Sequence, residues 1–344
     1  MNPPGSLGLC MPAEWEPHEA TWLAWPKNPE TFPAGILPRV EDSFCEIVAA
    51  ISRGEKAKLL IDDMGLLSQI EKMLTEKGAN ISNVEFRCIR TSDVWVRDYG
   101  PTFVIESKTN RVAAVKWKFN AWGGKYDDLL HDDEAGEKIA KMSDCEIFRP
   151  GIFLEGGSID VNGRGALLTT EQCLLNKNRN PDLARVDIEV VLKDHLSVDN
   201  IIWLGKGIEG DDTDGHIDDI ARFASEKAVL CAYSNKADAD GYALRKNYEM
   251  LKDRSDFEVC KLPMPDRIID AHDGRTLPAT YANFYICNSS VLVPAFGTPK
   301  DRVATDLIEG FFPNREILRI RCNELVFGYG AIHCITQQVP KIRD

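Results

Sequence analysis

Five residues from four distant parts of the chain have side chains that support covalent and acid–base chemistry. They are Asp98, Glu155, His216, Asp218 and Cys334. A cysteine with a histidine is the nucleophile–base pair of covalent catalysis. Additional carboxylates would repel the oxyanion that develops when a peptide carbonyl is attacked, but they match the planar, permanently charged guanidinium group. These residue types therefore predict covalent chemistry on a guanidinium carbon.

The guanidinium carbon is a poor electrophile because resonance spreads its charge, so it must be held in an attack geometry. Asp98 and Asp218 would clamp the N–H edges of the guanidinium and hold its carbon beside the thiolate of Cys334. His216 would protonate the departing ammonia and then deprotonate the water that hydrolyses the thiouronium adduct, while Glu155 would accept the other imidazole N–H. The carboxylates should raise the pKa of Cys334, whereas the substrate cation and His216 should lower it, and the sequence leaves this balance open.

These residues need a scaffold that brings distant positions to one centre, and a repeat in the sequence predicts one. Four segments read as β-hairpins, with apolar strands flanking a short polar turn. They cover residues 102–117, 158–169, 221–233 and 283–294, and their turn centres at residues 108, 163, 226 and 289 lie 55, 63 and 63 residues apart. Such regularity is typical of a repeat architecture. Asp98 and His216 precede a turn centre by ten residues, and Glu155 and Asp218 by eight, so the repeat gives them matching positions.

Each hairpin is followed by a helix-like stretch and a short strand, which makes a ββαβ unit. The predicted helices cover residues 133–142, 181–196, 240–251 and 301–311, and the strands 146–148, 201–204, 257–260 and 317–320. Upstream, residues 43–53, 59–61, 66–77 and 84–86 alternate helix and strand, and the tail 328–338 would supply a strand to complete a fifth unit. We therefore predict an α/β fold, a five-bladed α/β propeller built of ββαβ pseudo-repeats. It would form a single domain over residues 1–344, with its ligand site on the central axis.

The composition narrows the class of ligand. The chain has 41 Lys+Arg against 54 Asp+Glu, a net charge of −13, and a pI near 5.1. Without a basic stripe we expect no nucleic-acid partner, and the acidic surface favours small cationic ligands. Every apolar run is shorter than the ~20 residues of a membrane span, residues 1–5 lack the features of a signal peptide, and the ten scattered cysteines contain no CxxC pair. We expect a cytoplasmic protein with no membrane association and no metal.

Eight short motifs are spread over nearly the whole chain. They are residues 11–18 (Met-Pro-Ala-Glu-Trp-Glu-Pro-His), 22–26 (Trp-Leu-Ala-Trp-Pro), 95–103 (Trp-Val-Arg-Asp-Tyr-Gly-Pro-Thr-Phe), 119–124 (Phe-Asn-Ala-Trp-Gly-Gly), 155–158 (Glu-Gly-Gly-Ser), 169–176 (Thr-Thr-Glu-Gln-Cys-Leu-Leu-Asn), 215–218 (Gly-His-Ile-Asp) and 332–338 (Ile-His-Cys-Ile-Thr-Gln-Gln). This set resembles the agmatine deiminase and bacterial-type peptidyl-arginine deiminase family of the guanidino-modifying, or pentein, superfamily. The resemblance implies the five-bladed propeller, a reaction without a cofactor, and Cys334 rather than its neighbour His333 as nucleophile.

The resemblance favours agmatine as substrate, hydrolysed to N-carbamoylputrescine and ammonia, which is a step of putrescine biosynthesis. Two segments depart from the family pattern. Residues 213–216 read Thr-Asp-Gly-His where the family often has Thr-Asn-Gly-His, and residues 27–32 lack the Arg and Asn-Trp pattern common there. Both departures concern recognition of the far end of the substrate. The expected substrate-binding residues are Trp95 and Trp122, whose faces suit a flat cation, and Asp212 and Asp214, which would bind the terminal ammonium.

Four other functions stay open at this point. A deiminase of free or peptidyl arginine would share the chemistry, and a site for free arginine needs a basic group such as Arg97 for the α-carboxylate. An amidinotransferase would share the intermediate but exclude water. A metal hydrolase using His216, Asp218 and His333 would be sensitive to chelators, whereas the cysteine mechanism predicts inactivation by iodoacetamide. A propeller that only binds a protein partner would gain nothing from clustered, unpaired carboxylates. The sequence is compatible with a homo-oligomer.

Overall fold

The strands of this chain form several small sheets that share one strand pattern. The computed structural model describes residues 2–106 and 108–342, so Met1, residues 343–344 and Ser107, which falls in the turn of the first predicted hairpin, lie outside the described residues. Within the described ranges there are six sheets. In five of them an antiparallel pair is followed by a strand parallel to its second member. The fold is therefore mixed α/β, as the sequence predicts.

All four predicted hairpins are confirmed, each as the antiparallel pair of a three-stranded sheet. These sheets are, in strand order, β4 (Thr102–Glu106), β5 (Arg111–Val115) and β6 (Glu146–Phe148); β7 (Asp160–Val161), β8 (Ala166–Thr170) and β9 (Asn200–Leu204); β10 (Ala221–Ser225), β11 (Ala228–Tyr233) and β12 (Glu258–Pro263); and β15 (Tyr285–Ile286), β16 (Ser290–Ala295) and β17 (Glu316–Arg321). The small pair β13 (Ile268–Ile269) and β14 (Thr276–Leu277) forms a separate sheet.

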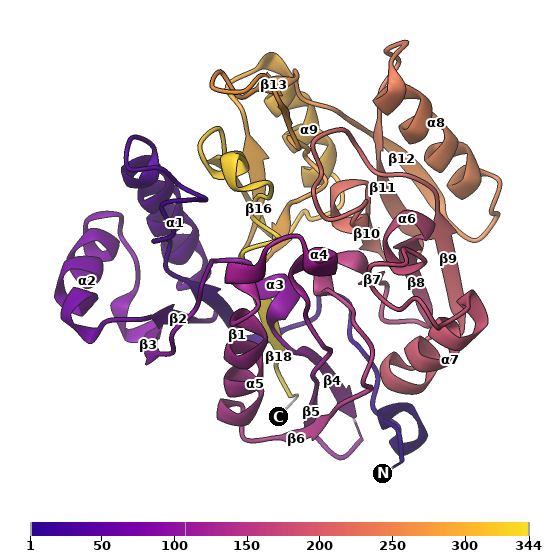
Figure 1. The fold of residues 1–344 in the computed structure, drawn as a ribbon, viewed down its shortest axis with the longest axis horizontal. Helices are drawn as coiled ribbons and strands as arrows, with labels where there is room; N and C mark the ends of the chain where they lie inside the picture. The colour runs from indigo at the N-terminus through magenta and orange to yellow at the C-terminus, as the bar shows by residue number, and fades with distance from the viewer. Residues whose placement is uncertain (1, 107, 343–344) are drawn as a thin grey trace.

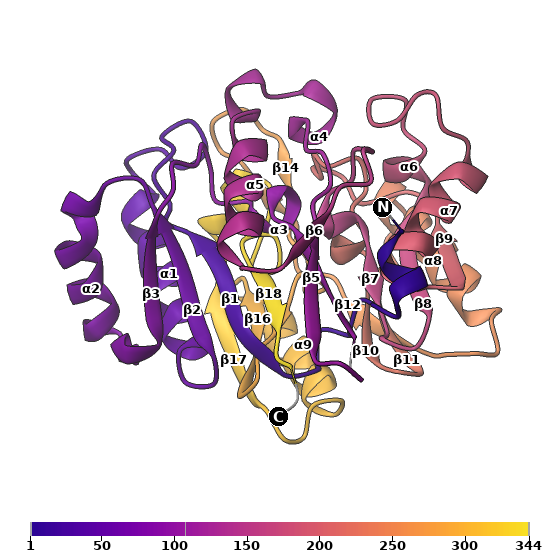
Figure 2. The same cartoon turned by 90° about the horizontal axis from the view of Figure 1, so that it is seen from below.

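A sixth sheet joins the two ends of the chain. Its strands, in order, are β18 (Gln337–Pro340), β1 (His18–Ala24), β2 (Lys56–Ile61) and β3 (Val84–Cys88). The last strand, β18, runs antiparallel to the first, β1, and the indigo and yellow strands lie side by side in Figures 1 and 2. The two ends of the sequence thus meet in one sheet.

Helices connect the parallel neighbours of the sheets. The long ones are α1 (Leu37–Ile51), α2 (Leu67–Glu76), α5 (Asp132–Met142), α7 (Arg185–Leu196), α8 (Ala239–Lys252) and α9 (Pro299–Glu309). Figure 1 shows α8 and α9 near the outside of the molecule, with the strands β11, β12 and β16 of their sheets on the inner side. The short helices and 3₁₀ turns are α3 (Val96–Tyr99), α4 (Ala121–Gly124), α6 (Glu171–Leu174), η1 (Pro4–Leu7), η2 (Met64–Leu66), η3 (Ile81–Asn83), η4 (Asp127–Leu129), η5 (Gly156–Ser158), η6 (Ile217–Asp219) and η7 (Leu325–Gly328).

Local sequence explains why these helices form where they do. In α1, Val40, Phe44, Ile47, Val48 and Ile51 recur at helical spacing and are all buried, so one apolar stripe faces the sheet. The start of α9 has Pro at its first position and a capping box between Thr298 and Asp301. Such caps satisfy the backbone N–H groups that the first helical turn leaves free.

The prediction that the tail supplies a strand to the amino-terminal unit is confirmed by the pairing of β18 with β1, but two details of these end segments are wrong. The strand β1 is absent from the sequence-based assignment, which treated residues 22–26 only as a motif. The tail strand begins at Gln337, so most of the predicted segment 328–338 is turn rather than strand. Gly328 ends η7 and Tyr329 adopts a left-handed backbone with φ of 67°, which breaks an extended chain at this point.

No helix of residues 2–106 and 108–342 combines the length and hydropathy needed to cross a membrane.

Candidate active site

Short helical turns directly before three of the hairpins carry four of the predicted site residues. Asp98 lies in α3 ahead of β4, and Asp218 lies in η6 ahead of β10. Glu155 and His216 are the residues that immediately precede η5 and η6. All four side chains are buried. A turn at the same place in successive units therefore carries these side chains, as the repeat in the sequence predicts.

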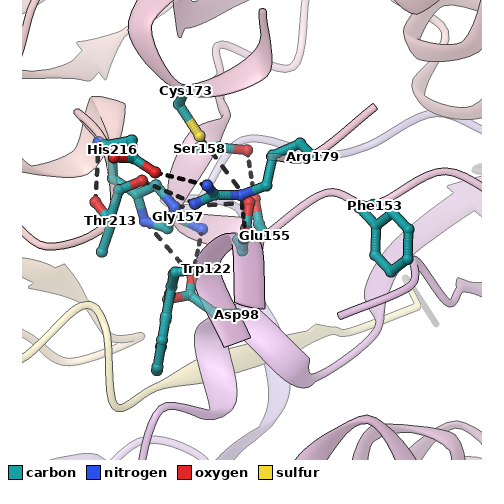
Figure 3. A network of polar contacts seen from close by, with 12 residues as sticks. Asp98, Trp122, Phe153, Glu155, Gly157, Ser158, Cys173, Arg179, Thr213 and His216 are labelled. Carbon is teal, nitrogen blue, oxygen red and sulfur yellow. Dashed lines mark hydrogen bonds and ion pairs between the residues drawn. The ribbon is translucent and has the colours of Figure 1, made fainter. Parts of the chain in front are cut away.

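Gly157 marks the point at which three of these groups meet. A Cβ atom at this position would lie 2.5 Å from Nδ1 of His216, 3.0 Å from Oδ1 of Asp98 and 3.1 Å from Oδ2 of Asp218. The N–H of Gly157 also donates to Oδ1 of Asp98 over 3.0 Å (Figure 3). The second glycine of the Glu-Gly-Gly-Ser motif is thus required because any side chain would displace these groups.

Cys334 is held beside the same cluster by an asparagine. Its Sγ lies 3.7 Å from Oδ2 of Asp218 and accepts a hydrogen bond from Nδ2 of Asn283 over 3.1 Å. Oδ1 of Asn283 accepts the backbone N–H groups of Cys334 at 3.3 Å and of His333 at 2.9 Å. Asn283 therefore fixes both the backbone and the sulfur of residue 334. The sequence analysis placed Asn283 at the start of the fourth hairpin but assigned it no role, although that position was the available signal.

The carboxylates of Asp98 and Asp218 have different hydrogen-bond partners. Oδ2 of Asp98 accepts the indole N–H of Trp122 over 2.9 Å. Oδ2 of Asp218 lies 2.7 Å from Nδ1 of His333. Within the part of the chain that the structure describes, Oδ1 of Asp218 has no hydrogen-bond partner. An unpaired buried carboxylate oxygen is costly, and a guanidinium N–H would satisfy it.

His216 lies between two carboxylates without being hydrogen-bonded to either. Its Nδ1 is 3.7 Å from Oδ1 of Asp98, and its Nε2 is 3.9 Å from Oε2 of Glu155. Neither ring nitrogen has a hydrogen-bond partner among the described residues. Burial would lower the pKa of His216, but Asp98, Cys173 and Glu155 outweigh it and hold that pKa well above its usual value. The imidazole is therefore held ready to donate a proton.

The sequence left open whether the pKa of the Cys334 thiol is raised or lowered, and burial decides this. Desolvation, together with the charges of Asp218, Asp219 and Asp98, raises the pKa of Cys334 well above its usual value. Burial also raises the pKa of Asp98 to about 6, with Asp218 and Glu155 adding to it and His216 opposing it. Without a bound cation the thiol is thus protonated at neutral pH. A cation bound between these carboxylates would offset the charges that disfavour the thiolate.

Cys334 and Asp98 line a partly open cavity whose walls are aromatic and acidic. The aromatic residues that line it are Trp95, Trp122, Tyr126, Phe327 and Tyr329, and the other acidic residues that line it are Glu30, Asp128 and Asp212. No lysine, arginine or histidine of the described residues lines this cavity. Such walls match a flat cation with an aliphatic chain.

Glu155, His216 and Asp218 are not among the residues that line the cavity, and neither are Asp214 and Arg97, which the sequence analysis considered for binding the substrate. Asp214 does not line it, because its carboxylate is engaged by Asn178, Arg179 and Lys125. Arg97 is buried and donates to Gln338 and to the carbonyl of His333, so its guanidinium is engaged outside the cavity. Asp212 does line the cavity, where the hydroxyl of Tyr126 donates to it.

The candidate metal ligands of this site fall into two groups. The ligand atoms of Glu155, Cys173 and His216 lie within 4.8 Å of one another, and so do those of Asp218, Asp219 and Cys334. His333 joins neither group of the described residues. Its Nε2 lies 2.8 Å from Oε2 of Glu14, and Nδ1 faces Asp218. The combination of His216, Asp218 and His333 that a metal hydrolase would need is therefore not assembled around one point.

Sequence reasoning missed three further residues that contact the site: Glu14, Asn283 and Arg179. The Arg179 guanidinium is fully buried against Glu155, with Nε donating to Oε1 over 2.7 Å (Figure 3). Glu14 lay inside the first of the eight motifs and Arg179 just beyond the 169–176 motif, so proximity to a motif was the only signal that sequence offered.

Comparison with known proteins gives consistent matches over almost the full chain. The model of the Porphyromonas-type peptidyl-arginine deiminase family matches residues 10–340. An agmatine deiminase of Stutzerimonas stutzeri is 38% identical, with 98% of this chain and 97% of that protein covered. The structure of the agmatine deiminase of Enterococcus faecalis has a TM-score of 0.90 and 34% identity, covering 99% of this chain and 98% of that one. An agmatine deiminase of C. jejuni with substrate bound has a TM-score of 0.87 and 31% identity, covering 97% of each chain.

Proposed function

This chain belongs to the Porphyromonas-type peptidyl-arginine deiminase family, and from that membership we propose that it is an agmatine deiminase. It hydrolyses agmatine to N-carbamoylputrescine and ammonia, which makes it a hydrolase of a guanidino C–N bond. The observation that carries the choice of substrate is the cavity beside Cys334, whose described lining has carboxylates and aromatic rings but no cationic side chain. Agmatine is a dication, whereas free arginine brings a carboxylate that this lining would repel.

The reaction begins when the guanidinium enters the buried cluster. Asp98 and Asp218 bind its N–H groups, and the unpaired Oδ1 of Asp218 gains a partner. The positive charge of the substrate lowers the pKa of Cys334, so the thiol releases its proton to solvent, and the thiolate attacks the guanidinium carbon to give a tetrahedral adduct. His216 passes a proton to the departing amino group, ammonia leaves, and a thiouronium ester remains on Sγ.

The second half of the reaction uses the same groups in reverse. His216, now neutral, takes a proton from water as the water oxygen bonds to the thiouronium carbon. Collapse of this adduct breaks the C–S bond, the proton of its new hydroxyl passes to the departing sulfur, and the Cys334 thiol and the neutral ureido product are released. Glu155, whose Oε2 lies 3.9 Å from the imidazole, stabilises the charged form of His216 in both halves. No cofactor enters these steps.

The same proposal includes the arrangement of the sheets. Five sheets share an antiparallel pair with a parallel neighbour, and the fifth is completed by strand β18 pairing with β1. This pattern supports a five-bladed α/β propeller in which residues 1–344 form one domain. The turns that precede successive hairpins then face the propeller axis, which accounts for the meeting of Asp98, His216 and Asp218.

A substrate panel tests the function. Agmatine, free arginine and a blocked arginyl peptide are supplied at equal concentrations, and ammonia and ureido product are both measured. We expect turnover of agmatine, with arginine slower by about a hundredfold or more because its carboxylate has no partner in the cavity. Faster turnover of the peptide would reassign the protein to peptidyl-arginine. Transfer of the amidino group to an added amine, without ureido product, would reassign it as an amidinotransferase.

Asp212 is the residue that we propose for the terminal ammonium of agmatine. It lines the cavity, its carboxylate is half-exposed, and Lys125 lies 3.6 Å away as a competing cation. The Asp212→Asn variant should lose about fivefold to tenfold in kcat/KM for agmatine, the worth of a partly exposed ion pair. Butylguanidine, which lacks the ammonium, should be turned over equally by both proteins. Asp127→Asn is the matched control, because this exposed neighbour of the cavity does not line it. An equal loss on both substrates would remove Asp212 from this role.

A further inference from the structure

Arg179 is a buried cation beside the site that the reaction described above does not use. It follows α6 in the loop that leads to α7, and its side chain is completely buried. Its guanidinium N–H groups donate to four acceptors, one each on Glu155, Thr213, Asp214 and the adjacent Asn178. Nε donates to Oε1 of Glu155 over 2.7 Å, Nη1 to Oδ1 of Asn178 and to Oδ2 of Asp214 at 2.7 Å each, and Nη2 to the carbonyl of Thr213 at 2.9 Å.

These contacts join the two segments that carry Glu155 and His216, as Figure 3 shows. Glu155 directly precedes η5, and Thr213 and Asp214 lie in the loop that ends at His216. The hydroxyl of Thr213 accepts the backbone N–H of His216 over 3.1 Å, so only one residue separates the guanidinium from the histidine backbone. A planar guanidinium with fixed donor directions is suited to holding two segments at one spacing.

The same cation also determines the charge of Glu155. Burial would raise the pKa of Glu155, but Arg179 and His216 outweigh it and hold that pKa below its usual value. Because Arg179 occupies Oε1, Oε2 remains for His216 at 3.9 Å and for the thiol of Cys173 at 4.0 Å. An ionised Glu155 is in turn one of the groups that keep His216 protonated.

We propose that Arg179 is a positioning residue that fixes the spacing of Glu155 and His216 and keeps Glu155 ionised, and that it thereby sets the pH at which His216 can act as the acid. This inference rests on the proposed deiminase function and extends it to a residue that does not touch the substrate. Several other groups face His216 and contribute to its charge state. They are Asp98 of α3, Glu155, Cys173 of α6, Asp211, and Asp218 and Asp219 of η6.

These charges determine the direction in which loss of Arg179 moves the pH profile. Without the cation, the pKa of Glu155 rises, and the carboxyl is neutral over more of the pH range. His216 then loses one of the carboxylates that hold its proton, so its pKa falls. The alkaline limb of the kcat/KM profile, where His216 must still be protonated, therefore moves to lower pH.

Two variants of Arg179 separate the effect of its charge from the effect of its hydrogen-bond geometry. In Arg179→Gln the alkaline limb should move down by about one pH unit. In Arg179→Lys the charge remains and the limb should stay, but kcat should fall between about tenfold and a hundredfold, because one ammonium cannot span Glu155 and Thr213. Histidine NMR titration, with His216 assigned through His216→Gln, follows the imidazole without substrate and gives a readout that does not depend on turnover.

Asn180→Ala is the matched control, because Asn180 sits in the same loop and bonds both the N–H and the carbonyl of Phe153, two residues before Glu155. It should lower Tm and leave the alkaline limb in place. An unchanged limb and unchanged histidine titration in Arg179→Gln would overturn the inference. If that variant does not fold, Arg179→Lys decides alone, and an unchanged kcat there overturns it. If the unsubstituted protein releases no ureido product from agmatine, the function fails instead, and the titration still reports on Arg179.

Discussion

The Cys334→Ala protein should bind agmatine and release neither ammonia nor N-carbamoylputrescine. Among the described residues, Cys334 is the one cysteine that lines the cavity, and its sulfur lies 3.7 Å from Oδ2 of Asp218, where the guanidinium would be held. Without Sγ no thiouronium ester can form, and direct attack by water on the resonance-stabilised guanidinium carbon is slow. We expect kcat to fall on the order of 10⁴-fold or more, as for other nucleophile removals. Ammonia release and ureido product measured over hours give the rate.

A second cysteine provides the control for this variant. Cys322 is fully buried in the hydrophobic core and does not line the cavity, so Cys322→Ala should keep the turnover rate while losing some stability. Mass spectrometry of the unsubstituted protein quenched during turnover should find the substrate-derived adduct on the peptide that contains Cys334. Residual turnover of Cys334→Ala within a hundredfold of the unsubstituted protein would contradict covalent catalysis by this thiol.

The Asp218→Asn protein should show opposite changes in thiol reactivity and in turnover. The negative charge of Asp218 helps to hold the pKa of Cys334 above its usual value, next to burial, so its removal lowers that pKa. A larger thiolate fraction at a given pH makes Cys334 react faster with iodoacetamide. Turnover of agmatine should nevertheless fall on the order of a thousandfold, because the guanidinium loses a buried carboxylate partner.

The pH dependence of alkylation makes this prediction measurable. Iodoacetamide labelling of the Cys334 peptide is followed by mass spectrometry from pH 6 to pH 10, and its midpoint should lie at lower pH in Asp218→Asn. The exposed thiol of Cys88 serves as an internal reference, since its labelling should be the same in both proteins. A midpoint that stays or moves upward, or turnover within tenfold of the unsubstituted protein, would show that Asp218 does not act as described.

The sequence alone determined the residue types of the site and the units that carry them. Apolar strands flanking a short polar turn are a local pattern, so all four hairpins were predicted correctly, and the helix-like stretch after each hairpin located the helices α5, α7, α8 and α9. Their bounds shifted by up to four residues, as for α7, which begins at Arg185 rather than at residue 181. The matching positions of Asp98, Glu155, His216 and Asp218 before successive hairpins followed from the same local pattern.

Contacts between distant segments were decided only by the tertiary structure. Asn283 reaches the sulfur of a residue 51 positions away, and Glu14 reaches His333 across 319 positions. Asp212 and Asp214 were both expected to bind the substrate, but the structure places them in different surroundings. Asp212 lines the cavity, whereas Asp214 adopts a left-handed backbone with φ of 66° and contacts Arg179 and Lys125 instead. The charge state of Cys334 belongs to this class, because burial and the distances to three carboxylates set its pKa. A sequence pattern encodes which residues share a local element, but desolvation and charge depend on the neighbours that folding brings together.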